Sequence, residues 1–159
     1  MTVSLAILGG LLALDATSVG QFMISRPLVA GTLAGWWLGD PGLGLEIGAI
    51  LELFYIAGVP AGGSRVPETG SASVVAVAVA VSAGGLAGLA LGLVAGLVTS
   101  ELGGMSVGLQ RRLVGNLFDW IEAGSTTAPK VTSAHLFSVF LDFVRGAVVT
   151  AVAVVVGSW

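Results

Sequence analysis

The chain has 159 residues, of which 55% are hydrophobic and 9% are charged, and its mean hydropathy is +1.02. Soluble domains carry about 25% charged residues, so six basic and nine acidic side chains are too few to cover a water-exposed surface, and we predict an integral membrane protein. The net charge of −3 gives no basic face for a nucleic acid, the absence of cysteine excludes disulfides and thiolate chemistry, and a lone histidine disfavours a metal site.

Residues 1–71 contain apolar segments that are short for a spanning helix, which needs about 20 residues. Residues 3–14 and 28–39 fall below that length, and residues 43–59 carry two glutamates. Residues 3–14 lack a preceding Lys or Arg and a following cleavage site, so we expect them to be the first element of the mature chain and not a signal peptide. Short segments interrupted by Gly and Pro are typical of broken or re-entrant helices; three ordinary, slightly short helices are the alternative.

Asp15, Gln21 and Arg26 lie close together between two apolar runs. We predict that they form a polar loop between two half-helices. Pro27 fits the start of the second half-helix, because its missing N–H costs nothing in the first turn.

Glu52 lies within the apolar sequence "GAILELFYIAGV". A carboxylate in such a segment costs a few kcal/mol to bury and is by default a functional hypothesis. Glu52 can accept two hydroxyl hydrogen bonds, as a sugar offers; the alternative is a structural pair with Arg26 or Arg65. Glu46 lies about 240° away around the helix, so we expect it to be structural or interfacial.

The stretch "GVPAGGSRVPETGS" (58–71) follows. It predicts a tight turn with exposed backbone N–H groups beside Glu68, or a simple loop between two helices.

Residues 72–99 are predicted to be one long span. The run "ASVVAVAVAVS" alternates with the period of a strand, but a lone strand cannot satisfy its backbone in lipid, so we predict a helix. Glycines follow at a spacing of four residues and form one stripe, which predicts a face where another helix approaches closely, although Gly is also simply frequent in this chain. These are Gly84, Gly88, Gly92 and Gly96.

The last third predicts two further helices. Residues 105–122 repeat Leu and Ile every four positions, with polar residues on the other faces, as in an amphipathic helix at the membrane interface or beside the bundle. Residues 136–159 form the last span, which holds Asp142 and Arg145. Half of the basic residues lie between the two long spans, which favours a cytoplasmic loop. The predicted class is therefore an all-α integral membrane protein, a polytopic helical bundle with broken or re-entrant helices in one domain.

No enzyme signature is present: the chain has no Walker loop, no Gly-x-Ser-x-Gly and no metal-spaced His/Glu pattern. His135, at the start of the last span, fits an interfacial or structural histidine better than a phosphoryl acceptor. Catalysis by this chain alone is not expected, and no cofactor is predicted.

The string from "LDATSVGQFMISRPLVAG" to "GVPAGGSRVPE" resembles the enzyme IIC subunit of the mannose/fructose/sorbose family of the phosphoenolpyruvate-dependent sugar phosphotransferase system. The ending "AHLFSVFLDFVRGAVV" is also similar to a span of that family. The marks are Asp15, Gln21, Arg26-Pro27-Leu28, Gly39-Asp40, Gly44, Gly48, Glu52, Gly62-Gly63 and Pro67, and in the ending His135, Phe140, Leu141 and Arg145.

The resemblance implies a multi-pass subunit of the bacterial inner membrane that pairs with an enzyme IID subunit to form the sugar path. A cytoplasmic phosphorylated enzyme IIB, supplied by IIA, would phosphorylate the sugar, and a homo-oligomer is possible. The implied sugar-binding residues are Asp15, Gln21, Glu52 and Glu68. The implied supporting residues are Arg26, Pro27, Gly62, Gly63 and Pro67.

Two departures from the family pattern leave a second reading open. Glu68 stands where relatives commonly have Asp after the proline, and this sequence stops soon after the span with Arg145, whereas typical relatives continue. A non-transporting membrane scaffold or regulatory remnant is therefore the alternative to a sugar-transport subunit.

Overall fold

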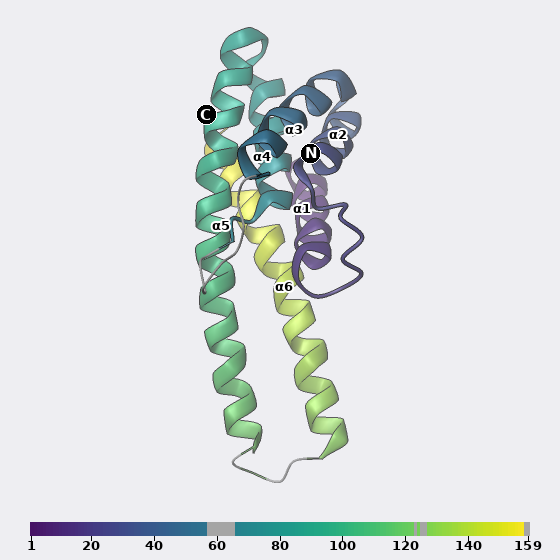
Figure 1. Ribbon diagram of the computed structural model, residues 1–159, viewed down its shortest axis with the longest axis vertical. Coiled ribbons are helices and arrows are strands. Elements are labelled where there is room, and N and C mark those ends of the chain that lie inside the picture. The colour runs from purple at the N-terminus through teal and green to yellow at the C-terminus, as the bar shows by residue number, and fades with distance from the viewer. Residues whose placement is uncertain (57–65, 123, 125–126, 158–159) are drawn as a thin grey trace.

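The computed structural model describes residues 1–56, 66–122, 124 and 127–157, and every element in this part of the chain is a helix (Figure 1). In chain order these are α1 (Thr2–Thr17), α2 (Pro27–Leu38), α3 (Pro41–Tyr55), α4 (Thr69–Ala83), α5 (Gly85–Glu122) and α6 (Ala128–Gly157). Among the described residues, α5 and α6 are long and apolar enough to cross a membrane. The first four helices have 12 to 16 residues each. The predicted all-α class is confirmed.

The helix α4 lies at the centre and contacts all five other helices. Its residues 70–80 are all buried. A helix that is apolar on every side is normally enclosed by other elements, and the small Ala and Val side chains let those elements come close. The period-two pattern of Ala and Val therefore belongs to a helix, as predicted; its central position is a finding of the structure.

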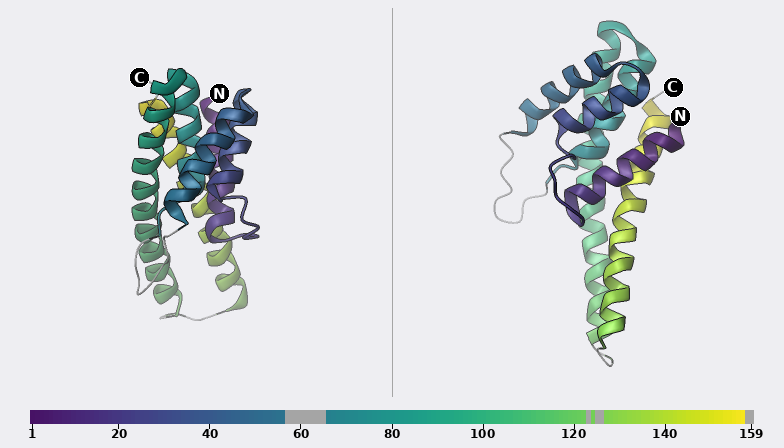
Figure 2. Two further views of the ribbon diagram at one scale, coloured as in Figure 1. Left: turned by 45° about the horizontal axis from the view of Figure 1, so that its top comes forward. Right: turned by 90° about the vertical axis from the view of Figure 1, so that its right-hand side faces the viewer.

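The helices α2 and α3 form an antiparallel hairpin that turns at Gly39 and Asp40 (Figure 2). Gly39 has a φ of 87°, and the Asp40 carboxylate caps α3. A Cβ at Gly35 would lie 2.7 Å from Gly44 Cα, so the two backbones touch with no room for side chains. The glycines at this contact are Gly31, Gly35, Gly44 and Gly48.

The predicted single span at 72–99 is wrong in its extent. The chain reverses at Gly84 and Gly85, which have φ values of 71° and 59°, and continues as α5 alongside α4. Positive φ is accessible to glycine at little cost, whereas other L-residues rarely adopt it. Two adjacent glycines therefore allow a turn where hydropathy alone predicts continuity.

Three of the four striped glycines lie at the contact between α4 and α5. A Cβ at Gly88 would lie 2.5 Å from Ala80 O, and one at Gly96 would lie 2.8 Å from Ala76 Cβ; Gly92 meets the same two alanines. Gly84 belongs to the turn and has no atom near its Cβ position. The stripe thus packs against α4.

The helices α5 and α6 run antiparallel. The C-terminal part of α5 and the N-terminal part of α6 extend together beyond the other helices (Figure 1). The predicted separate helix at 105–122 is instead the second half of α5, and the last span begins at Ala128 rather than at residue 136. At 1.5 Å per residue, the 38 residues of α5 span about 57 Å. That length exceeds the roughly 30 Å of the hydrocarbon core.

Candidate functional site

Residues 18–26 connect α1 to α2 without forming a helix; we call them the connecting segment. Within it Gln21 and Met23 have φ values of 53° and 64°. Non-glycine residues avoid this region and persist there only when their surroundings hold them. That support comes from Asp15 of α1, Glu52 of α3 and Thr69 of α4, which bond to the segment.

Asp15, near the end of α1, holds the middle of the connecting segment. Its Oδ1 accepts a hydrogen bond from Phe22 N at 2.7 Å, and its Oδ2 accepts one from Ser25 N at 2.9 Å. The residue is only 4% exposed. Hydrogen bonds from backbone amides to a carboxylate are stronger than neutral ones, so both oxygens of Asp15 stabilise the segment.

Glu52, on α3, holds the end of the segment and the beginning of α2. Its Oε1 forms an ion pair with Arg26 Nη2 at 2.8 Å, and its Oε2 accepts a hydrogen bond from Leu28 N at 3.3 Å. A carboxylate at a helix N-terminus also interacts favourably with the helix dipole. The structure therefore shows the pairing with Arg26 that the sequence left as an alternative, next to Pro27 at the first position of α2.

Glu68 caps α4. Its carboxylate accepts hydrogen bonds from the backbone N (3.2 Å) and the hydroxyl of Ser71, and it is 4% exposed. The next residue, Thr69, donates from its hydroxyl to Ser25 O at 3.2 Å. The start of α4 is thereby joined to the connecting segment.

The four implied sugar ligands have different partners in the structure. Asp15 and Glu52 hold different parts of the connecting segment, Gln21 lies exposed within it, and Glu68 is buried at the cap of α4. Pro67 lies directly before that cap. Gly62, Gly63 and Arg65 lie outside the described residues.

A second polar group, to which the sequence assigned no role, joins the start of the connecting segment to α5 and α6. Asp142 accepts hydrogen bonds from the Ser18 hydroxyl and from Gln110 Nε2, the latter at 2.9 Å. Arg145 Nη1 donates to Ser106 Oγ at 3.2 Å, while its Nε lies 3.9 Å from Asp142 Oδ1. An Asp and an Arg three residues apart inside an apolar span were the available signal.

Two polar cavities adjoin the connecting segment. One, of about 370 Å³, is lined by Ser18, Gln110 and Asp142 among others. The other, of about 260 Å³, is lined by Ser25 and Glu68 among others. Both include Thr17, Val107 and Arg111 in their walls, so they lie side by side around the end of α1.

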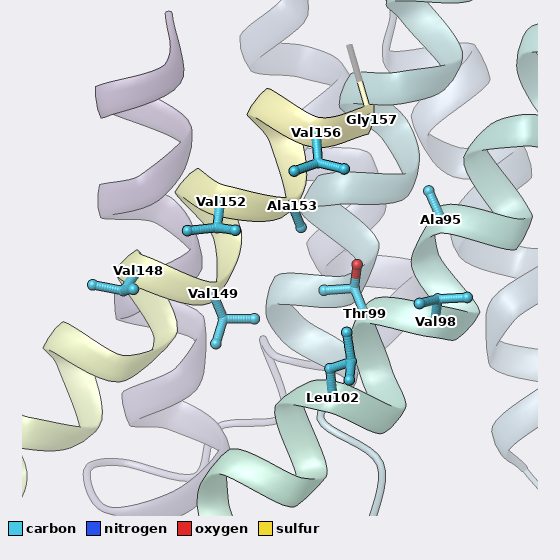
Figure 3. Close-up of a pocket in the computed structure, with 10 residues that line it drawn as sticks. All are labelled: Ala95, Val98, Thr99, Leu102, Val148, Val149, Val152, Ala153, Val156 and Gly157. Carbon is cyan, nitrogen blue, oxygen red and sulfur yellow. The ribbon is translucent and has the colours of Figure 1, made fainter. Parts of the chain in front are cut away.

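A larger groove of about 440 Å³ lies between α5 and α6 (Figure 3). Thr99 carries the one side-chain oxygen drawn there, and that residue is itself 4% exposed. A sugar would find almost no hydrogen-bonding partner in such a groove. The polar cavities are therefore the better candidates for a polar ligand.

The whole chain, residues 1–159, matches the family described as EII-Sor, PTS system sorbose-specific IIC component. The chain belongs to this family. It is also similar to a chain in the cryo-EM structure of the mannose transporter ManYZ in complex with microcin E492 (MceA), with a TM-score of 0.78 and 22% identity. That likeness covers 99% of this chain and 64% of the other, so this chain spans less than two thirds of the other's length. No curated protein sequence matches it.

The expected relationship to mannose-family IIC components is thus confirmed, as is the helical membrane-protein fold. In this IIC component, Asp15 and Glu52 hold non-helical backbone between short apolar helices. Non-helical backbone is tolerated at membrane depth only where protein or a wet cavity surrounds it. Ser18 and Ser25, near the two ends of the connecting segment, line the two polar cavities, whereas residues 19–24 between them are exposed on this chain.

Proposed function

We propose that this chain binds and translocates a hexose-type sugar as the membrane subunit of a sugar phosphotransferase system. The match of all 159 residues to the sorbose-specific IIC family carries the proposal. The non-helical connecting segment between short apolar helices, bordered by polar cavities, supports it, because transporters place their substrate sites at such interruptions. Asp15 and Glu52 would support the site by fixing this segment.

The chain would work with other subunits in the bacterial inner membrane. Its similarity to a chain of the ManYZ transporter supports a complex with an enzyme IID subunit. A soluble enzyme IIB, phosphorylated by IIA, would supply the phosphoryl group. This chain would then contribute the sugar path and not the phosphoryl carrier.

The test is sugar uptake by cells that lack their own mannose-family permease. The chain is co-expressed with IID, IIB and IIA subunits of the same family, and accumulation of labelled mannose, fructose or sorbose phosphate is measured. We expect accumulation that requires this chain, with cells expressing only the other subunits as the control. A folded membrane complex that neither transports nor binds any of these sugars would contradict the proposal and favour a non-transporting scaffold.

A further inference from the structure

The cavity of about 370 Å³ lies where the end of α1 meets α5 and α6; we call it the α1–α5–α6 crevice. Its polar wall includes Thr17, Ser18, Gln110 and Asp142, and its apolar wall includes Val107 and Phe118. Its volume falls within the roughly 300–1,000 Å³ of small-molecule sites. Mixed walls of this kind suit a ligand that has both hydroxyl groups and an apolar face.

The polar side chains of the crevice are held in place but not fully satisfied. Asp142 is fixed by Ser18 and by Gln110 Nε2, which leaves Gln110 Oε1 buried without a hydrogen-bond partner among the described residues. Behind them Arg145 Nη2 is buried without a hydrogen-bond partner in this part of the chain, and its Nε has the ion pair with Asp142 but no hydrogen bond. Leaving Gln110 Oε1 unpaired costs free energy, which a hydrogen-bonding ligand in the crevice would recover.

The crevice has charges of both signs in and beside its wall, which favours a neutral hydrogen-bonding ligand. An anion would meet the Asp142 carboxylate, and a cation would meet Arg111 in the wall and Arg145 beside Asp142. A neutral polyhydroxylated molecule meets neither repulsion. Its hydroxyl groups can bond to Gln110 and Asp142, while its C–H face packs against Val107 and Phe118.

We infer that the α1–α5–α6 crevice binds the sugar, with Gln110 and Asp142 as its hydrogen-bonding residues. This inference rests on the proposed function and moves the site from the carboxylates implied by the resemblance to residues that the sequence left unassigned. Ser18, the first residue of the connecting segment, forms one edge of the crevice. Asp15 and Glu52 would then act on the sugar through the segment they hold.

The chain offers a matched pair of glycines on α5 for the test. Gly115 lines the crevice, whereas Gly108 is not among its lining residues, and a Cβ at either position meets no atom within 4 Å. Gly115→Leu therefore fills the crevice without a clash at its Cβ, and Gly108→Leu makes the same change elsewhere on the helix. Gln110→Met removes both hydrogen-bonding atoms while keeping the length of the side chain.

The measurement is equilibrium binding of labelled mannose, fructose and sorbose to the purified complex with IID in lipid nanodiscs, without a phosphoryl donor. We expect Gln110→Met to weaken binding about tenfold, as for one lost hydrogen bond, and Gly115→Leu to weaken it further. Gly108→Leu should bind as the wild type does. Each variant is first checked by size-exclusion chromatography and thermal unfolding.

The outcomes separate this inference from the proposed function. If the wild type binds a sugar and both Gly115→Leu and Gln110→Met bind it equally well, the crevice is not the site, although the proposed function stands. Equal losses in Gly108→Leu and Gly115→Leu would likewise overturn the inference. A folded wild-type complex that binds none of the three sugars would overturn both.

Discussion

At the scale of single residues, Asp15 and Glu52 show what a buried or half-buried carboxylate can do in an apolar chain. Each uses both of its oxygens within the protein: Asp15 on two backbone amides, and Glu52 on Arg26 and on the backbone of Leu28. These bonds fix a segment in which Gln21 and Met23 have left-handed backbone conformations. The carboxylates thereby define a non-helical backbone that apolar contacts alone would not specify.

Asp15→Asn tests this role. Asparagine keeps one acceptor oxygen but turns an NH₂ group toward the other backbone amide, so we expect a loss of about 2 kcal/mol in stability. The connecting segment should also become more sensitive to proteases. Thermal unfolding and limited proteolysis of the purified protein measure both effects.

Glu46→Gln is the matched control, because Glu46 is exposed on α3. This variant should keep wild-type stability and protease resistance. If Asp15→Asn behaves like the control, the connecting segment does not depend on its carboxylate.

The sequence located these polar residues but not their partners. The grouping of Asp15, Gln21 and Arg26, and the alternative of an Arg26–Glu52 pair, could be read from one chain. The backbone amides that bind Asp15 could not, because every residue except proline carries one. The bond between Gln110 and Asp142 could not be predicted either, because nothing in the sequence shows which residues of α5 face which residues of α6.

At the scale of helices, glycine determines how closely neighbours approach. The α2–α3 hairpin and the α4–α5 pair both bring backbone against backbone at glycines spaced four residues apart. Close approach of this kind drives helix association in membranes, where apolar side chains gain little from leaving lipid. The spacing predicted the α5 stripe, and the same spacing at Gly31 and Gly35 would have predicted the hairpin contact.

Gly44→Ala should separate the hairpin. The added Cβ would lie 2.8 Å from Gly35 Cα and would also meet Gly31 O, so helix backbones rather than flexible side chains must move. Overpacking of this kind costs about 1–3 kcal/mol, and we expect a lower melting temperature in detergent.

Gly42→Ala is the control on the same helix. Its Cβ would meet only Asp40 Oδ1, at 3.6 Å, which is ordinary contact. Alanine also favours helix formation by up to about 1 kcal/mol, so the melting temperature should stay the same or rise. A larger loss for Gly42→Ala than for Gly44→Ala would show that the glycine contact is not what holds the hairpin together.

At the scale of the whole molecule, α4 is the element on which the others assemble. Both α1 and the α2–α3 hairpin contact it, and so do the two long helices α5 and α6. Hydropathy placed this segment in the membrane but merged it with the beginning of α5. That error followed from the turn at Gly84 and Gly85, because two glycines read equally well as part of a small-residue stripe and as a reversal of the chain.

Because α4 is enclosed by the other helices, we expect larger side chains on it to cost stability. Ala76 is fully buried on α4, and its neighbours across the contact include Gly92 and Gly96 of α5. In Ala76→Leu, the larger side chain would have to displace α5 or a helix on another face of α4. We expect a loss of about 3 kcal/mol or more, at the upper end for overpacked cores.

The same substitution at Ala87 should be harmless, because Ala87 is exposed on α5. Unfolding of both variants, followed by tryptophan fluorescence in one detergent, gives the comparison. If Ala76→Leu unfolds with the same midpoint as Ala87→Leu, then α4 can shift without cost and its surroundings are loosely packed. A large difference would show instead that the molecule is assembled around one helix of small side chains, because only a tightly enclosed position distinguishes two identical substitutions.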